Sequence, residues 1–329
     1  MPYYFGTAET GTALVNAITA ACVANGWTLT GDILNKGAAY VQATATNQQW
    51  VSGTKFYSGW MVDLLGGTGM SAGVLTGAMP YRVRIGGLNN HTYNVVLRPM
   101  TYPVAYEIHV FTDPDEVYVV VNHDGDRYSH LMFGISDMAA QVGGTGLWLH
   151  GLFNSGIFWG YSFYCSPNGL NASRYGNNQE SGFAGGLFTT ATPYSAAQTP
   201  AYILVNAFLH HAVNGTLGWT TNQDQPRALA AHSPMMARSP SLSNRNAPLF
   251  PVQAYLGRPD NMVSLVLDLK NIRYMRNDDY AAGQVFSIGP DVWKSYPWLH
   301  KNITTRDGGN GAGNTHSGTL AYAIRYDGP

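Results

Sequence analysis

The fold is decided by residues 106–135, which read YEIHVFTDPDEVYVVVNHDGDRYSHLMFGI. Three runs rich in β-branched and aromatic residues fill this segment, and turn-forming residues at 113–115 and 124–126 separate them. Runs of this length and composition are typical of strands, and the short turns indicate that consecutive strands pair antiparallel. The segment therefore predicts a three-stranded antiparallel meander.

Both faces of the predicted meander are apolar. We expect one face to carry Val119, Val121 and Phe111, and the other to carry Ile108, Val110 and Val120. Strands that are apolar on both faces are usually covered on both faces. A further layer is therefore predicted on each side of the meander, and an amino-terminal helix is a candidate for one of them.

This helix is predicted from apolar residues that recur at helical spacing between Leu14 and Cys22. Thr7 or Thr10 precedes them as a candidate N-cap, because a hydroxyl oxygen accepts a hydrogen bond from the first helical turn. The Asn-Gly pair at 25–26 supplies the stop. The sequence predicts a helix that leads into β structure.

Short extended runs between glycine turns predict further strands at 27–29, 33–35, 39–46, 81–85, 93–97, 262–269, 272–275 and 319–326. Residues 66–77 hold five glycines, which predicts a loop or a segment where backbones approach closely. Residues 202–211 form a short apolar element of ambiguous type.

The predicted fold class is α+β and predominantly β, with an amino-terminal helix packed on an antiparallel meander or sandwich with long loops. Residues 1–165 are expected to hold the helix and the meander. Residues 166–329 are expected to be a loop-rich β region, which forms either a second domain or part of the first. The proline-rich residues 220–251 indicate either an extended arm that crosses a neighbouring subunit or a surface loop.

The composition indicates that neighbours cover much of the surface. Charged residues make up 11% of the 329 residues, against roughly 25% in average soluble proteins. A soluble monomer normally covers itself with charged side chains. We therefore expect a homo-oligomer or a complex with defined partners, the alternative being a neutral β protein that stands alone.

Several partner classes are disfavoured. The formal net charge of −1 supplies no basic field for a nucleic acid. The start of the chain does not resemble a signal peptide, and no apolar run approaches the roughly 20 residues that a membrane span requires. Cys22 and Cys165 are too few for a disulfide framework or a zinc site, and we expect them to be buried in a protein made in a reducing cytosol. No cofactor and no metal are predicted.

One segment matches a catalytic motif. Residues 69–73 fit the nucleophile elbow G-x-S-x-G around Ser71, which needs a strand before the serine and a helix after it. Gly77 and Pro80 leave no room for that helix. We therefore do not expect Ser71 to be a nucleophile.

The histidines of the meander raise the possibility of a zinc site. If the loop after His123 has two residues, His109 and His130 both lie opposite Val119, about 10 Å apart across the sheet. If it has three, His130 turns to the other face from His123. Neither register makes a compact site, so hydrogen-bonded histidines at strand positions are predicted.

The acidic residues Asp113, Asp115 and Glu116 resemble a general-acid pair, but they fall at a predicted turn. Aspartate is common in turns for backbone reasons, so a solvated turn is predicted. No catalytic, cofactor-binding or metal-binding residue is assigned, and the chain is expected not to be an enzyme.

The segments 26–29, 100–102, 106–109, 113–118 and 318–322, together with the opening helix, resemble a family of virion structural proteins of tailed bacteriophages. Members of that family are usually assigned to the tail or its tip. The resemblance covers both ends of the chain and the meander. It implies many copies in a virion, assembly in the bacterial host cytoplasm, and a place near the host-contacting end.

Three functions remain as hypotheses. The first is a non-enzymatic structural subunit of the tail, baseplate or tail tip, which contacts other virion proteins and copies of itself. The alternative is a receptor- or glycan-binding module at the host-contacting end, suggested by tryptophan, tyrosine, asparagine and histidine in the loop-rich parts. The third is a hydrolase that acts on the cell envelope. The one dense group of acidic residues that could serve it is Asp113, Glu116, Asp124 and Asp126.

Overall fold

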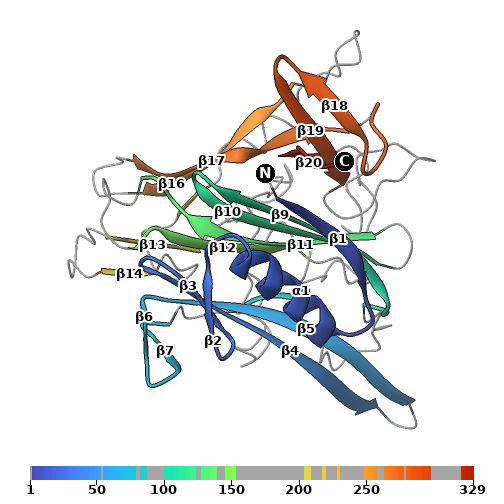
Figure 1. The fold of residues 1–329 in the computed structure, drawn as a ribbon, viewed down its shortest axis with the longest axis vertical. Helices are drawn as coiled ribbons and strands as arrows, with labels where there is room; N and C mark the ends of the chain where they lie inside the picture. Colours follow the sequence, from blue (N-terminus) through green and yellow to red (C-terminus); the bar gives the residue numbers. More distant parts are fainter. Residues whose placement is uncertain are drawn as a thin grey trace, which may run out of the picture.

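Three antiparallel sheets lie one above another, and helix α1 lies between two of them (Figure 1). The structure is a computed structural model, and it describes residues 2–52, 55–78, 82–86, 100–123, 127–138, 145–152, 204–208, 217–219, 228–229, 248–257, 263–277, 279–297 and 320–329. The predicted α+β, predominantly β class is confirmed. Over these residues, no helix has both the length and the apolar character to cross a membrane.

The central sheet has the strand order β1-β9-β10-β11-β12-β13-β14. Its strands are β1 (Tyr3–Ala8), β9 (Val104–Thr112), β10 (Asp115–His123), β11 (Arg127–Ile135), β12 (Leu147–Leu152), β13 (Leu204–Phe208) and β14 (Leu217–Trp219). The predicted meander is confirmed as β9, β10 and β11. Val119 lies between Ile108 and Leu131, and His123 pairs with Arg127, so residues 124–126 connect β10 to β11.

The two faces of the meander divide differently from the prediction. Phe111 was expected beside Val119, and this is wrong because the β9–β10 register puts Phe111 on the face of Val120. Ile108 lies opposite Val119 and shares its face. The tight turn at 113–114 sets this register, and a slip of one residue would exchange the faces. We call the face of Val119 the helix face and the face of Val120 the carboxy-terminal face.

The amino-terminal sheet has the order β2-β3-β4-β5-β8. Its strands are β2 (Thr28–Thr30), β3 (Ile33–Lys36), β4 (Ala39–Ser52), β5 (Lys55–Gly67) and β8 (Val83–Gly86), and β6 (Gly69–Ser71) pairs with β7 (Val74–Thr76) in a separate hairpin. The glycine-rich segment is thus a hairpin rather than a loop. The predicted close approach is confirmed, since a Cβ on Gly67 would lie 2.5 Å from Leu75 Cγ.

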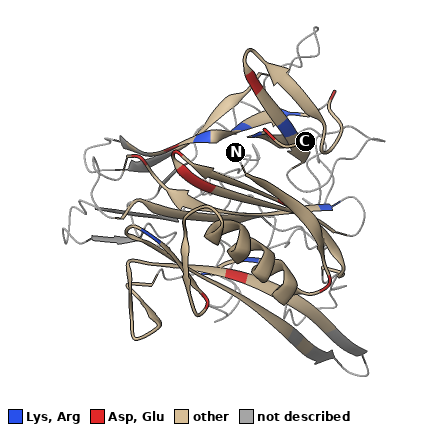
Figure 2. Cartoon of the chain, in the orientation of Figure 1, with Lys and Arg blue, Asp and Glu red and all other residues tan. Residues whose placement is uncertain are grey.

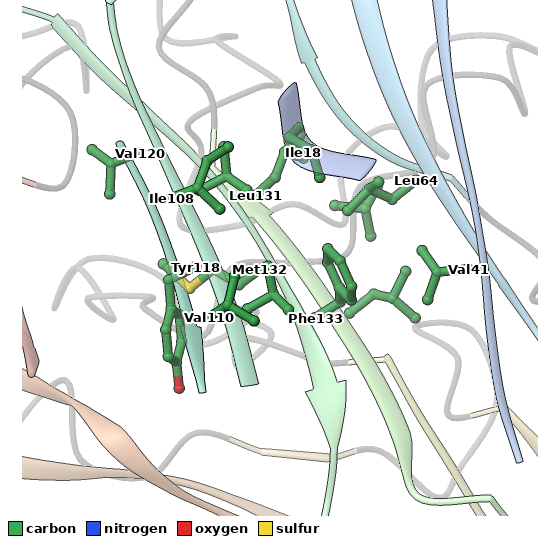
Figure 3. Packing of buried hydrophobic residues seen from close by; sticks show 14 of the residues in the cluster. Ile18, Val41, Leu64, Ile108, Val110, Tyr118, Val120, Leu131, Met132 and Phe133 are labelled. Carbon is green, nitrogen blue, oxygen red and sulfur yellow. The ribbon is translucent and has the colours of Figure 1, made fainter. Parts of the chain in front are cut away.

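Helix α1 (Gly11–Val23) lies between the amino-terminal sheet and the helix face of the central sheet. The Thr10 side chain caps its start by accepting a hydrogen bond from the backbone N–H of Ala13, and Gly26 follows its end with φ of 86°. Both features were predicted. Leu14 and Ile18 are fully buried, and Figure 3 shows Ile18 packed among side chains of both sheets.

The carboxy-terminal sheet has the order β15-β16-β17-β20-β19-β18 and covers the other face of the central sheet (Figure 1). Its strands are β15 (Ala228–Leu229), β16 (Phe250–Gly257), β17 (Val263–Arg276), β18 (Val285–Ile288), β19 (Asp291–Pro297) and β20 (Leu320–Arg325). The two strands predicted at 262–269 and 272–275 are one strand, β17. The element of ambiguous type at 202–211 contains β13.

One hydrophobic cluster joins α1 and all three sheets, and it includes residues from both predicted regions of the chain, such as Leu14 and Ile324. Cys22 belongs to this cluster and is buried, as predicted, and burial raises the pKa of its thiol to about 12. Several predictions lie outside the described residues: the strand at 93–97, Cys165, and most of the proline-rich segment at 220–251.

Candidate functional site

The densest group of buried polar side chains lies between the central and carboxy-terminal sheets. Alternation along the strands turns polar side chains of β9, β10, β11 and β12 toward the carboxy-terminal sheet. From the central sheet these are Glu107, His109, Glu116, Tyr118, His130 and His150, and from the carboxy-terminal sheet Asn271, Lys294, Tyr296 and Tyr322. We call this group the polar interface.

Glu107 organises one end of the polar interface. Its Oε2 accepts hydrogen bonds from Tyr3 Oη at 2.5 Å, Lys294 Nζ at 2.5 Å and Tyr296 Oη at 2.6 Å. Burial alone would raise the pKa of Glu107, but the bonds from Lys294, Tyr296 and Tyr3 outweigh it and lower the pKa. Glu107 is therefore ionised at neutral pH and joins the first strand of the chain to β19.

Lys294 is enclosed by aromatic rings at the same end. Its Nζ lies 5.2 Å from the ring centroids of Tyr3 and Tyr326 and 5.7 Å from that of Tyr296. Each ring face attracts the ammonium through its quadrupole. Lys294 Nζ also donates to Tyr3 Oη at 3.1 Å, since the single hydroxyl proton of Tyr3 goes to Glu107. A charged pair is thus held in a mostly aromatic environment.

His109 extends this network into the core. Its Nε2 lies 2.8 Å from Tyr296 Oη, whose single proton goes to Glu107. Nε2 must therefore carry the proton and donate to Tyr296. Burial lowers the pKa of His109 to about 3, against the opposing charge of Glu107, so the ring is neutral at pH 7. The result is a directed chain of bonds from His109 through Tyr296 to Glu107.

Glu116 organises the middle of the polar interface. Its carboxylate accepts from the backbone N–H of Lys270 at 2.9 Å, from the N–H and Nδ2 of Asn271 at 3.0 and 2.8 Å, and from Tyr118 Oη at 2.8 Å. Burial raises the pKa of Glu116 although these four bonds oppose the change. The carboxylate links β10 to β17 through donors on both sheets.

The donors for Glu116 come from an irregularity in β17. The strand β16 pairs with Arg273 at Pro251 and with Leu269 at Val252, so residues 270–272 are left out of the β16 ladder. Backbone N–H groups that leave a ladder need another acceptor when they are buried. Glu116 supplies this acceptor, which explains why a carboxylate is buried there.

Two histidines on neighbouring strands complete the polar interface. His130 Nε2 lies 3.0 Å from the backbone carbonyl of Pro297, so this nitrogen carries a proton, and its ring contacts the edge of Tyr322 at 4.9 Å between centroids. His150 is buried beside it. Burial, and then the charge that His130 would carry, lowers the pKa of His150 to about 3.

The polar interface can hold the two sheets in a single register. Its carboxylates are engaged by donors of the same chain, and burial raises the pKa of Tyr118 and Tyr296, which remain hydrogen-bond donors. Within the described residues, no three His, Cys, Asp or Glu side chains are placed to share a metal ion.

The predicted histidine trio is divided between the two faces of the central sheet. Alternation along β10 places His123 on the helix face with Val119, where its Nε2 lies 2.9 Å from Ser129 Oγ. His109 and His130 lie on the carboxy-terminal face. The prediction of separate, hydrogen-bonded histidines is confirmed for all three.

The other predicted candidates also separate. Ser71 ends β6, and a two-residue turn leads into β7, so a strand follows Ser71 where the nucleophile elbow needs a helix. The prediction of a solvated acidic turn is wrong for Glu116, which lies on β10 and is buried. Asp113 is exposed, and Asp115 forms an ion pair with Lys36 at 2.6 Å. Asp124 and Asp126 lie outside the described residues, as do most of the aromatic loops that suggested a glycan site.

Sequence reasoning missed Glu107, Lys294 and His150. A signal was present, because Glu107 stands between Tyr106 and Ile108 in a run that is otherwise typical of a strand covered on both faces. A charged residue at such a position indicates a buried partner on the facing layer.

Comparison with models of known protein families found no match to this chain, and comparison with curated proteins found none either.

Proposed function

We propose that the chain is a non-enzymatic structural subunit of a bacteriophage virion, in the tail, baseplate or tail tip, which acts through contacts between subunits. The observation that carries the proposal is that large apolar side chains are exposed on strands at the edges of the sheets. Among the described residues these are Phe5 on β1, Leu29 on β2, Val74 on β7, Val285 and Ile288 on β18, and Val23 at the end of α1. Except for Val23, each lies on a strand at the edge of its sheet.

A strand at a sheet edge presents unpaired backbone groups and can pair with another chain. Proteins that remain monomeric protect such edges with charged side chains, prolines or bulges. Here each of the strands β1, β2, β7 and β18 exposes an apolar side chain and carries no charged residue. Figure 2 shows how sparse the charged residues are over the described chain. Edges of this kind suit a protein whose neighbours cover them.

The hairpin of β4 and β5 supports the same proposal. Residues 47–52 pair with residues 55–60, whereas β3 reaches only Gln42 and β8 only Met61. The hairpin therefore continues as a two-stranded ribbon beyond its sheet (Figure 1). A two-stranded ribbon is marginally stable in water without another surface, and a neighbouring subunit would provide one.

The assignment to a bacteriophage virion rests on the resemblance of the meander and chain ends to tail proteins. It implies other virion proteins and copies of this chain as partners, and assembly in the bacterial cytoplasm. The non-enzymatic part of the proposal is supported by the polar interface, whose carboxylates bind donors of their own chain.

The experiment that tests the proposal is an inventory of purified particles from the phage that encodes the chain. Mass spectrometry should find the chain in many copies per particle, and antibody labelling should place it on the tail. A Val285→Lys variant, which puts a charge on an exposed edge position, should fold but enter particles at a reduced level. Particles that contain no copy of the chain would refute the proposal.

A further inference from the structure

The strand β1 is the longest of the described strands that end a sheet. It pairs with β9 through all six of its residues, and no described strand lies along its other edge. The edge strands β2 and β18 have three and four residues. Short edges are one way in which proteins avoid unwanted pairing. The edge of β1 lacks this protection.

The side chains of β1 also lack protective charge. The strand reads Tyr-Tyr-Phe-Gly-Thr-Ala, without a charged residue. Phe5 is 65% exposed, and Thr7 is exposed on the same face. The Phe5 ring stacks on Tyr3 with 5.5 Å between centroids, so an aromatic pair stands at the open edge. Burying exposed aromatic surface would favour association.

The strand is held rigidly although it is at an edge. Tyr3 Oη donates to Glu107, and the carbonyl of Pro2 accepts from the backbone N–H of Val110 at 3.2 Å. The Tyr106 ring lies over Gly6, since a Cβ at Gly6 would come within 2.8 Å of its hydroxyl. A fixed edge loses little conformational entropy when a partner strand pairs with it.

We infer that β1 pairs antiparallel with β1 of a second copy, across a two-fold axis at Phe5, so that the two central sheets become continuous. In this register Phe5 lies opposite Phe5 of the second copy, and Tyr3 lies opposite Thr7. An isologous contact of this kind closes as a dimer. The inference deepens the proposed function and rests on it, because it names the partner for one exposed edge.

A second copy fits this edge better than a charged peptide does. Neither strand carries a charged residue, so no like charges meet between the two paired strands. The net charge of −1 gives two copies little mutual repulsion. Phe5 of one copy then packs against Phe5 of the other copy, as cross-strand aromatic pairs do in stable sheets.

The first test is the mass of the purified full chain, measured by light scattering and sedimentation over a range of concentrations. The natural chain should form a dimer. Phe5→Lys should weaken the dimer at least tenfold, because two ammonium groups would meet directly across the axis. Val74→Lys is the matched control: Val74 is 66% exposed and lies on β7, so this variant should dimerise like the natural chain.

The second test fixes the register. Under mild oxidation Phe5→Cys should cross-link to itself within the dimer, because the axial pair of Cα atoms is about 5.5 Å apart, within the range that a disulfide spans. Thr7→Cys alone should not cross-link, whereas a mixture of Tyr3→Cys and Thr7→Cys chains should. Val74→Cys is again the control.

A natural chain that stays monomeric at every concentration, or a dimer that Phe5→Lys leaves unchanged, would overturn the inference. So would efficient cross-linking by Thr7→Cys alone. If the monomer is still found in purified particles, only the self-pairing of β1 is wrong and the proposed function stands. If the chain is neither dimeric nor present in particles, both are wrong.

Discussion

The two faces of the central sheet hold their neighbouring layers by different physical means. On the helix face, Leu131 lies with Ile18 and Leu64 in a cluster of aliphatic and aromatic side chains (Figure 3). On the carboxy-terminal face, Glu107 and His109 are bound by donors and rings of β19. Three β-strands contribute to both faces, so the difference arises from alternate residues alone.

Apolar burial is non-directional, and it stabilises the helix face in proportion to the area removed from water. Hydrogen bonds and ion pairs are directional, so the polar interface specifies a single register for the carboxy-terminal sheet. Directionality has a cost, because each buried titratable group makes stability depend on pH. The comparison thus predicts that acid destabilises the carboxy-terminal face more than the helix face, because more of the buried titratable groups lie there.

The largest expected effect is acid destabilisation through the polar interface. The pKa values of His109 and His150 fall from 6.5 to about 3 on folding because both rings are buried. The unfolded chain therefore binds more protons between these values, and stability falls as the pH drops below 6.5, until about pH 3. At about 1.4 kcal/mol per pKa unit, each histidine costs on the order of 5 kcal/mol at the acid end.

Urea unfolding at pH 7, 5 and 4 would measure this loss. His109→Phe and His150→Phe should each flatten the decline, whatever they do to the stability at pH 7. The lowered pKa of Glu107 adds to the acid loss, and the raised pKa of Glu116 opposes it. If the chain that carries both His109→Phe and His150→Phe lost stability with acid as steeply as the unsubstituted chain, the assignment of the effect to this face would be contradicted.

The next largest effect is the loss of stability when a buried apolar side chain near the helix face is truncated. Leu64 is fully buried on the helix side of the amino-terminal sheet, and Leu64→Ala should cost about 3 kcal/mol through lost burial and a residual cavity. The loss should be the same at pH 7 and pH 5. Leu64→Met keeps the volume and is the matched control, with a cost below about 1.5 kcal/mol. A loss that grew with acidity would show that the two faces are not independent.

The smallest effect concerns the ion pair of Glu107 and Lys294. A double-mutant cycle with Glu107→Gln and Lys294→Met should give a coupling of about 1–2 kcal/mol at pH 7, since both groups are largely buried. The coupling should vanish as the pH falls through the lowered pKa of Glu107. The pair of Arg325 and Asp291 is the exposed control, at 3.0 Å, and should give about 0.5 kcal/mol or less. If the Glu107–Lys294 and Arg325–Asp291 pairs gave equal coupling energies, burial would not distinguish the two ion pairs.

The parts of the fold that the sequence predicts are local. Thr10 and Gly26 mark the ends of α1 within the segment itself, and β-branched runs with short turns identify the meander. The face of Phe111 was assigned wrongly because its register depends on one turn. Local patterns therefore predict elements well and faces less well.

The polar interface was not predictable in the same way. Lys294 is 187 residues from Glu107, and Asn271 is 155 residues from Glu116. Aspartates and a glutamate beside a turn suggest exposure when only neighbours in the sequence are considered. The buried environment of Glu116 arises from β17, whose ladder with β16 is interrupted at 270–272. No pattern near residue 116 contains this information.

The aromatic rings of Tyr3 and Tyr326, which both contact Lys294, bring the two ends of the described chain together. Tyr3 and Tyr326 contact each other with 5.1 Å between ring centroids, and Figure 1 shows both ends on the same side of the molecule. A short peptide that joins the ends would therefore fit the folded chain without strain. It would restrict only the unfolded chain, whose entropy would fall by an amount equivalent to about 6 kcal/mol at 25 °C. The natural contact closes the folded chain in the same place, but it breaks on unfolding and leaves the unfolded chain unrestricted.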